Sequence, residues 1–198
     1  MPARLLTLTL LSLALAGIPA PAVAHADRVP GIDVSRFDGE IRWDRVADAG
    51  IEFAFVQASR GAGDDCAVKP RRCGRDGFYR DNLREARAAG LRVGAYHRAF
   101  ADDDGAGGAR ADAQAEAKLF ADRVGELRRG DLLPVLDVEL PFGDLNAREL
   151  RRWLRTWLGV VKARLGAKPI IYTNVSSWSH TGDTTEFALG GHHLWVAN

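Results

Sequence analysis

The sequence has little cysteine, little net charge and few long apolar stretches. It contains two cysteines, and its 27 basic residues are nearly balanced by 26 acidic ones. No run of lysine and arginine stands out, and a nucleic-acid-binding surface needs such a concentration of positive charge. We therefore expect no nucleic-acid partner. The apolar stretch Leu5–Ile18 is shorter than the roughly 20 residues that a helix needs to span a bilayer.

The amino-terminal segment has the pattern of a secretory signal peptide. Arg4 precedes the apolar stretch, and small residues follow it up to Ala26. Two A-x-A cleavage sites compete, ending at Ala24 and at Ala26, and the second is favoured. An uncleaved membrane anchor is the alternative. We expect residues 1–26 to be removed, leaving a secreted domain of residues 27–198 that works as a monomer and does not insert into a membrane.

The two cysteines, Cys66 and Cys73, lie close together in a polar loop. An exported protein meets oxidising conditions, in which neighbouring cysteines pair. The sequence therefore predicts a Cys66–Cys73 disulfide that clips this loop. The alternative, half of a zinc site, lacks further ligands nearby.

From Gly31 onward, short β-branched and aromatic runs alternate with amphipathic helical stretches. This alternation is typical of a parallel sheet with crossover helices, an α/β fold. Strands are predicted at 31–35, 53–59, 92–100, 132–140, 169–174 and 194–198, and helices at 43–49, 78–89, 109–124 and from Asn146 to Leu165. Asn146 and Glu149 resemble a capping box at the start of the last helix, and Gly166 ends it.

Polar and aromatic residues decide between a doubly wound nucleotide fold and a β/α barrel. The first strand is not followed by the G-x-G-x-x-G that dinucleotide binding requires. Instead, nearly every strand ends in side chains that could meet at one mouth, as in a barrel. These residues are Asp33, Ser35, Gln57, Ser59, Tyr96, His97, Asp137, Glu139, Tyr172, Asn174, Trp195 and Asn198.

Two acids, Asp137 and Glu139, stand inside the apolar run "LPVLDVEL". Residues at i and i+2 of a strand share one face, and burying unpaired carboxylates is costly. With Asp33 near them, mutual repulsion and burial should raise the pKa of at least one carboxyl, and we expect Glu139 to carry the proton. A proton donor beside a charged carboxylate is suited to cleaving a glycosidic bond.

Two other readings of these acids remain. An ion-pair network with the plentiful arginines would make the pair structural. Metal binding is the second, with ligands from Asp33, His97, Asp137, Glu139 and the His192–His193 pair, but no H-E-x-x-H or comparable spacing supports it. His97 follows Tyr96 within a strand, which favours a hydrogen-bonded core histidine over a ligand.

The segments "GIDVSRFDGEIRW", "FAFVQAS", "GLRVGAYHRAF", "LPVLDVE", "PIIYTN" and "LWVAN", in this order, resemble the N-acetylmuramidase lysozymes of glycoside hydrolase family 25. The resemblance covers about Gly31 to Asn198. It implies an irregular β/α barrel and hydrolysis of the β-1,4 bond between N-acetylmuramic acid and N-acetylglucosamine in peptidoglycan, with no cofactor.

The resemblance also implies roles for individual residues. Glu139 would be the general acid. Asp137 would either attack the anomeric carbon or, as we favour, stabilise attack by the 2-acetamido group of the substrate, and Asp33 would tune the pair. The substrate-binding residues would be Tyr96, Tyr172 and Trp195 through their rings, and Gln57 and Asn174 through hydrogen bonds.

The chain departs from the family pattern at two places. Arg60 stands where the family commonly has a glutamate, so that side of the groove would bind different sugars or peptide stems. The family continues beyond the last strand with two more strands, so we expect six of about eight strands here and a longer gene product. A catalytically inactive peptidoglycan-binding module and a metal-dependent polysaccharide hydrolase or deacetylase are the alternative functions.

Overall fold

The computed structural model describes residues 28–63, 74–103 and 107–197. The predicted signal peptide, the predicted disulfide and Asn198 lie outside the described residues. In chain order the elements are β1 (Gly31–Val34), α1 (Trp43–Asp48), β2 (Phe53–Arg60), α2 (Tyr79–Ala88), β3 (Arg92–Arg98), α3 (Gly108–Val124), β4 (Val135–Val138), α4 (Ala147–Leu165), β5 (Ile170–Asn174), α5 (Val175–Ser179), α6 (Glu186–Leu189) and β6 (Leu194–Ala197).

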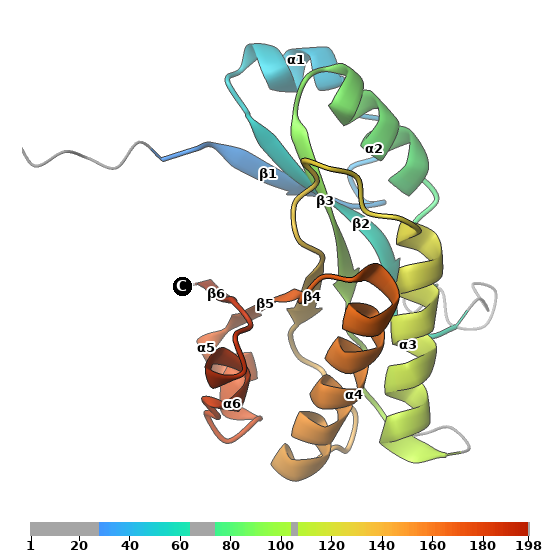
Figure 1. Cartoon of the computed structure of the whole chain (residues 1–198), viewed down its shortest axis with the longest axis vertical. Coiled ribbons are helices and arrows are strands. Elements are labelled where there is room, and N and C mark those ends of the chain that lie inside the picture. Colours follow the sequence, from blue (N-terminus) through green and yellow to red (C-terminus); the bar gives the residue numbers. More distant parts are fainter. Residues whose placement is uncertain (1–27, 64–73, 104–106, 198) are drawn as a thin grey trace, which may run out of the picture.

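Six parallel strands form one sheet whose spatial order is the chain order. The sheet is curled: in Figure 1, β1 and β6 lie toward the left of the view, and α3 and α4 cover the opposite side. Phe55 of β2 and Trp195 of β6 meet across the concave side, with ring centroids 5.7 Å apart. The predicted α/β fold, a barrel-like sheet with six strands in this chain, is therefore confirmed.

All six predicted strands and all four predicted helices are present, with ends shifted by a few residues. The largest difference is at residues 132–140, where only Val135–Val138 is strand. The two short helices α5 and α6 were not predicted. Each is too short, at five and four residues, to show a repeating apolar pattern.

Helix α4 illustrates how the sequence fixes an element and its packing. The Asn146 side chain accepts hydrogen bonds from the backbone N–H groups of Arg148 and Glu149 at 3.0 and 3.2 Å, and the Glu149 side chain accepts one from the Asn146 N–H at 3.0 Å. This is the predicted capping box. The apolar stripe of α4 is fully buried: Leu150, Trp153, Leu154, Trp157 and Val161. It packs against α3 and the convex side of the sheet.

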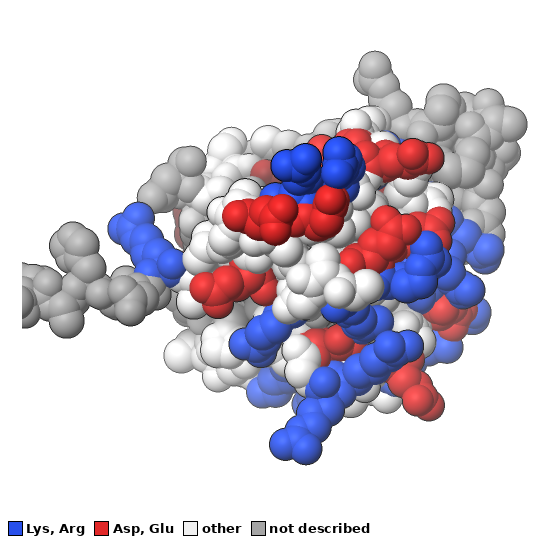
Figure 2. Space-filling view, turned by 90° about the horizontal axis from the view of Figure 1, so that it is seen from above, with Lys and Arg blue, Asp and Glu red and all other residues white. Residues whose placement is uncertain are grey.

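The surface seen from above in Figure 2 carries acidic and basic side chains close to one another. Neither sign forms an uninterrupted field over this face. Within the part of the chain that the structure describes, none of the helices combines the length and the apolar character needed to cross a membrane.

Candidate active site

Strand register brings side chains from all six strands of the described sheet to its concave side. Asp137 of β4 is level with Tyr172 of β5, and Tyr172 is level with Trp195 of β6. Since side chains alternate along a strand, residues at paired positions point to the same side. They enclose a cavity of about 130 Å³ lined by Asp33, Phe55, Tyr96, Val135, Asp137, Glu139, Tyr172 and Trp195.

The cavity brings together six of the eight predicted site residues, including all three acids. The other two, Gln57 and Asn174, are not among the lining residues, but each makes a hydrogen bond to one of them. The Gln57 amide donates to the Tyr96 hydroxyl at 3.3 Å, and the Asn174 amide donates to Oε1 of Glu139 at 2.9 Å. Gln57 is only 4% exposed, and the hydrogen bond to substrate that the sequence analysis expected of it stays a prediction.

The two acids of β4 differ in their surroundings. The Asp137 side chain is 14% exposed and that of Glu139 is 31% exposed. The pKa of Asp137 is raised to about 7, chiefly by burial and also by the nearby charges of Glu139 and Asp33, whereas Arg98 opposes the rise. The prediction that at least one carboxyl of the group has a raised pKa is confirmed at Asp137. The more buried carboxyl is the one whose charged form is penalised most.

Arg98, at the end of β3, was missed by the sequence analysis. Its Nε lies 3.5 Å from Oδ2 of Asp137 and 4.0 Å from Oε2 of Glu139. Its other nitrogens donate to the carbonyl oxygens of Ala99, Glu139 and Leu140 at 2.8 to 2.9 Å. Arg98 thus places a positive charge beside the acid pair and, through its hydrogen bonds, holds the backbone at Glu139 in position. The ion pair with an arginine, which the sequence analysis named as a structural alternative, is present. Both acids nevertheless line the cavity.

Aromatic rings form one wall of the cavity. Trp195 is 39% exposed and makes an edge contact with Tyr172, with ring centroids 5.0 Å apart. Phe55, which the sequence analysis did not select, supports Trp195 from β2. Exposed rings beside carboxyl groups offer apolar faces that can contact a sugar.

His97 and Ser59 point to the other side of the sheet. The prediction that His97 is a hydrogen-bonded core residue is confirmed: it is fully buried against α3. Its Nε2 lies 2.7 Å from Oε2 of Glu116, and its Nδ1 lies 2.8 Å from Oγ of Ser59. Burial lowers the pKa of His97 to about 3, so the ring is neutral. A carboxylate only accepts, so Nε2–H donates to Glu116 and Nδ1 accepts from Ser59. The expectation that Ser59 and His97 line the mouth was wrong.

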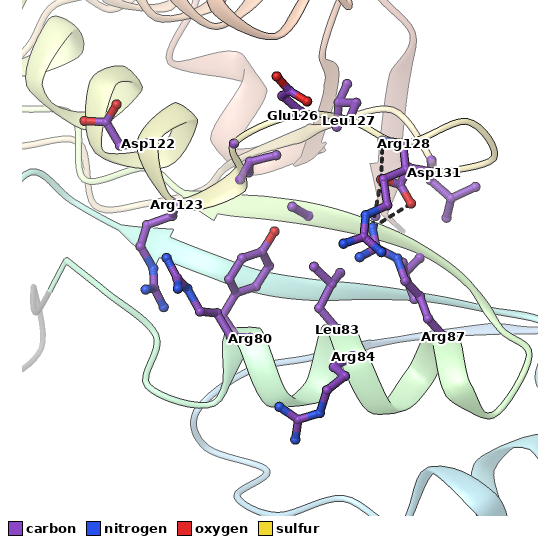
Figure 3. Close-up of a pocket in the computed structure, with 17 residues that line it drawn as sticks. Arg80, Leu83, Arg84, Arg87, Asp122, Arg123, Glu126, Leu127, Arg128 and Asp131 are labelled. Carbon is purple, nitrogen blue, oxygen red and sulfur yellow. Dashed lines mark hydrogen bonds and ion pairs between the residues drawn. The ribbon is translucent and has the colours of Figure 1, made fainter.

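A second and larger cavity, of about 920 Å³, lies outside the sheet between α2 and the end of α3. Figure 3 shows Arg80 and Arg123 pointing toward one another, and Arg87 and Arg128 beside Asp131. Arg87 holds Asp131 in an ion pair of 2.7 Å. The acidic residues that line this cavity are in ion pairs or lie apart from one another. The cavity therefore has no pair of neighbouring carboxyls for acid catalysis.

Among the residues described, no group of three His, Cys, Asp or Glu side chains is arranged to hold a metal ion. The Nδ1–H of His192 donates a hydrogen bond to the carbonyl oxygen of Pro169, at 2.8 Å. The histidine pair 192–193 is thus tied to the β5 entry and does not line the candidate active site.

The curled parallel sheet, with an acid pair and aromatic rings in its cavity, defines a barrel-like α/β protein with an acidic, aromatic-lined cleft. The family model of glycosyl hydrolases family 25 matches residues 32–198. The chain belongs to this family.

Two curated relatives and one solved structure show how far the similarity extends. YegX of Escherichia coli K12 is 37% identical over 189 residues, covering 90% of this chain and 61% of YegX. Lysozyme M1 of Streptomyces globisporus is 31% identical over 182 residues, covering 88% of this chain and 56% of that protein. The bacterial lysozyme from Streptomyces coelicolor is 30% identical, with a TM-score of 0.73 over 87% of this chain and 75% of that one. The chain spans about three fifths of the length of the curated relatives.

Proposed function

We propose that this protein is a secreted lysozyme that hydrolyses the β-1,4 bond between N-acetylmuramic acid and N-acetylglucosamine in peptidoglycan. One observation carries the proposal: Asp33, Asp137 and Glu139 line a single cavity together with the rings of Tyr172 and Trp195. Membership of family 25 and the similarity to two Streptomyces lysozymes support it. The signal-peptide pattern of residues 1–26 supports secretion.

In the proposed reaction, Glu139 protonates the glycosidic oxygen as the bond to the anomeric carbon breaks. The carbonyl oxygen of the 2-acetamido group attacks that carbon and forms a cyclic intermediate. Asp137 accepts a hydrogen bond from the acetamido N–H; its Oδ1 has no hydrogen-bond partner among the described residues. Water then opens the intermediate, and the Glu139 carboxylate takes up the proton of that water.

The raised pKa of Asp137 suggests how the acid pair is charged. At a pH below about 7, Asp137 holds a proton in the free protein. A donated N–H favours the carboxylate form, so substrate binding would release this proton toward Glu139. Asn174, which donates to Oε1 of Glu139, would leave Oε2 as the oxygen that exchanges protons. The positive charge of Arg98 would partly offset the negative charge of the two carboxylates when both are ionised.

Clearing of a peptidoglycan suspension tests the proposal. The protein should clear it in the presence of a chelator and create new reducing ends on N-acetylmuramic acid. Glu139→Gln should lower the rate by about 10²- to 10⁴-fold, the usual contribution of a general acid. Glu126→Gln, a matched change at an exposed position, should not lower it. Binding without clearing would indicate an inactive binding module, and loss of clearing in chelator would indicate a metal-dependent enzyme.

A further inference from the structure

Arg60, the last residue of β2, lies next to Arg98 on the edge of the candidate active site. The two residues are paired in the β2–β3 register. Their guanidinium carbons lie 4.8 Å and 5.3 Å from the centre of the same ring, that of Phe100. Arg98 also contacts Asp137, so the Arg60 guanidinium is one arginine away from the acid pair. A second ring, that of Phe37, lies 5.6 Å from Arg60 and is 78% exposed.

The two arginines differ in what they bind. Arg98 is held by three carbonyl oxygens and two carboxylates. Arg60 makes no side-chain hydrogen bond or ion pair with any residue that the structure describes, and its Nε is buried without a partner. A guanidinium carries five donors, and removing it from water without acceptors is costly. Arg60 therefore has the capacity to bind an anion that the protein itself does not provide.

The surrounding charges also favour an added anion. Burial lowers the pKa of Arg60, and the positive charges of Arg36 and Arg98 lower it further, while Tyr96 and Asp137 act in the opposite direction. Three guanidinium groups thus lie near one another. The acids in contact with Arg98, which are Asp137 and Glu139, are already bound to it, and the ionisation of Asp137 is opposed by burial. A bound negative charge would reduce the repulsion among the arginines.

We propose that Arg60, with Phe37 and Phe100 as its aromatic walls, binds a carboxylate of the substrate beside the cleavage site. The inference rests on the proposed function, and it adds that the preferred substrate is an anionic glycan. A planar guanidinium matches a carboxylate through two parallel hydrogen bonds. Two sources exist in peptidoglycan: the lactyl carboxylate of muramic acid in peptide-free strands, and the carboxylates of the peptide stem.

The test compares kcat/KM on three soluble glycans: peptide-free strands with free lactyl carboxylates, the same strands with these groups converted to methylamides, and peptide-bearing strands. The wild-type protein should prefer a carboxylate-bearing glycan over the methylamide by at least tenfold, and which of the two carboxylate-bearing glycans is preferred identifies the source. Arg60→Gln should lower kcat/KM on that glycan by about 10- to 100-fold and leave the methylamide unaffected, as expected for loss of a charged hydrogen bond. Arg60→Lys should lower kcat/KM less than Arg60→Gln does, because lysine keeps the positive charge but cannot form the two parallel hydrogen bonds of a guanidinium.

Arg152→Gln is the matched control, because Arg152 is exposed on α4. It should retain the wild-type preference. Equal wild-type rates on the methylamide and on both carboxylate-bearing glycans would overturn the proposal even if Arg60 variants do not fold. An equal loss on the preferred glycan and on the methylamide in Arg60→Gln would also overturn it. If the wild-type protein cleaves none of the three glycans, it is the proposed function that fails.

Discussion

Asp112, on α3 behind the sheet, should make the protein less stable as the pH rises. Its Oδ2 accepts hydrogen bonds from the Trp153 Nε1–H at 2.6 Å and from the Asp102 N–H at 3.3 Å. The pKa of Asp112 is raised from 3.8 to about 7, chiefly by burial and also by the neighbouring charge of Glu116. We therefore predict that Asp112→Asn, whose amide oxygen can accept the same two hydrogen bonds, is more stable than the wild type at pH 8.

The magnitude follows from the pKa. A carboxyl whose pKa rises from 3.8 to about 7 is penalised on ionisation by roughly 4 kcal/mol at 1.36 kcal/mol per pKa unit. Asp112 is only partly buried, and solvent screening reduces this to about 1 to 3 kcal/mol. The folded protein holds the proton more tightly than the unfolded chain. The stabilisation is therefore complete below the unfolded pKa near 4 and is lost as the pH rises through 7.

Urea unfolding at pH 5 and pH 8, followed by fluorescence of the five tryptophans, measures the effect. Between these pH values the wild type should lose about 1 to 2 kcal/mol more of its unfolding free energy than Asp112→Asn does. Asp48→Asn, a matched change at an exposed position, should follow the wild type. The reasoning is refuted if wild type and Asp112→Asn change in parallel, because Asp112 would then titrate alike in the folded and unfolded chains.

Two further predictions concern α4 and the acid pair. Asn146→Ala removes the acceptor of two backbone N–H groups at the start of α4, so it should lower the unfolding free energy by about 1 kcal/mol in urea without changing the m-value; an unchanged midpoint would contradict this. Arg98→Gln removes the positive charge that opposes the rise of the Asp137 pKa, so the pKa of this carboxyl should move higher. The pH profile of kcat/KM on soluble glycan measures it, and a fall in the corresponding pKa would exclude the assigned electrostatic role.

The parts of the site that follow from local pattern could be predicted from the sequence. Alternation along a strand is enough to place Asp137 and Glu139 on one side of β4, and both line the cavity. Alternation in other strands turns Asp33, Tyr172 and Trp195 to the same side of the sheet, where they line the same cavity. The capping residues of α4 act within one turn of helix, so their role was also readable.

The raised pKa of Asp137 could not be assigned to this residue from the sequence. It depends on how much solvent reaches each of two carboxyls only two residues apart, and that is decided by neighbouring strands. Arg98 and Tyr172 flank Asp137 in the sheet register, whereas Glu139 lies beyond the end of β4. The strand interior is therefore the drier position. Sequence spacing treats the two acids alike, but the packing around them does not.

A single irregularity explains most of what the sequence analysis missed on the basic side of the site. Alternation along β2 would place Ser59 on the same side as Gln57 and turn Arg60 toward the helices. The β2–β3 register instead shifts between Gln57 and Ser59, so that Ser59 pairs with His97 and Arg60 pairs with Arg98. A bulge of this kind reverses the direction of every later side chain in its strand. The same shift therefore gives His97 its buried hydroxyl partner and brings a second guanidinium to the rim of the cavity. If the bulge were removed by deleting one residue of β2, both features should be lost together.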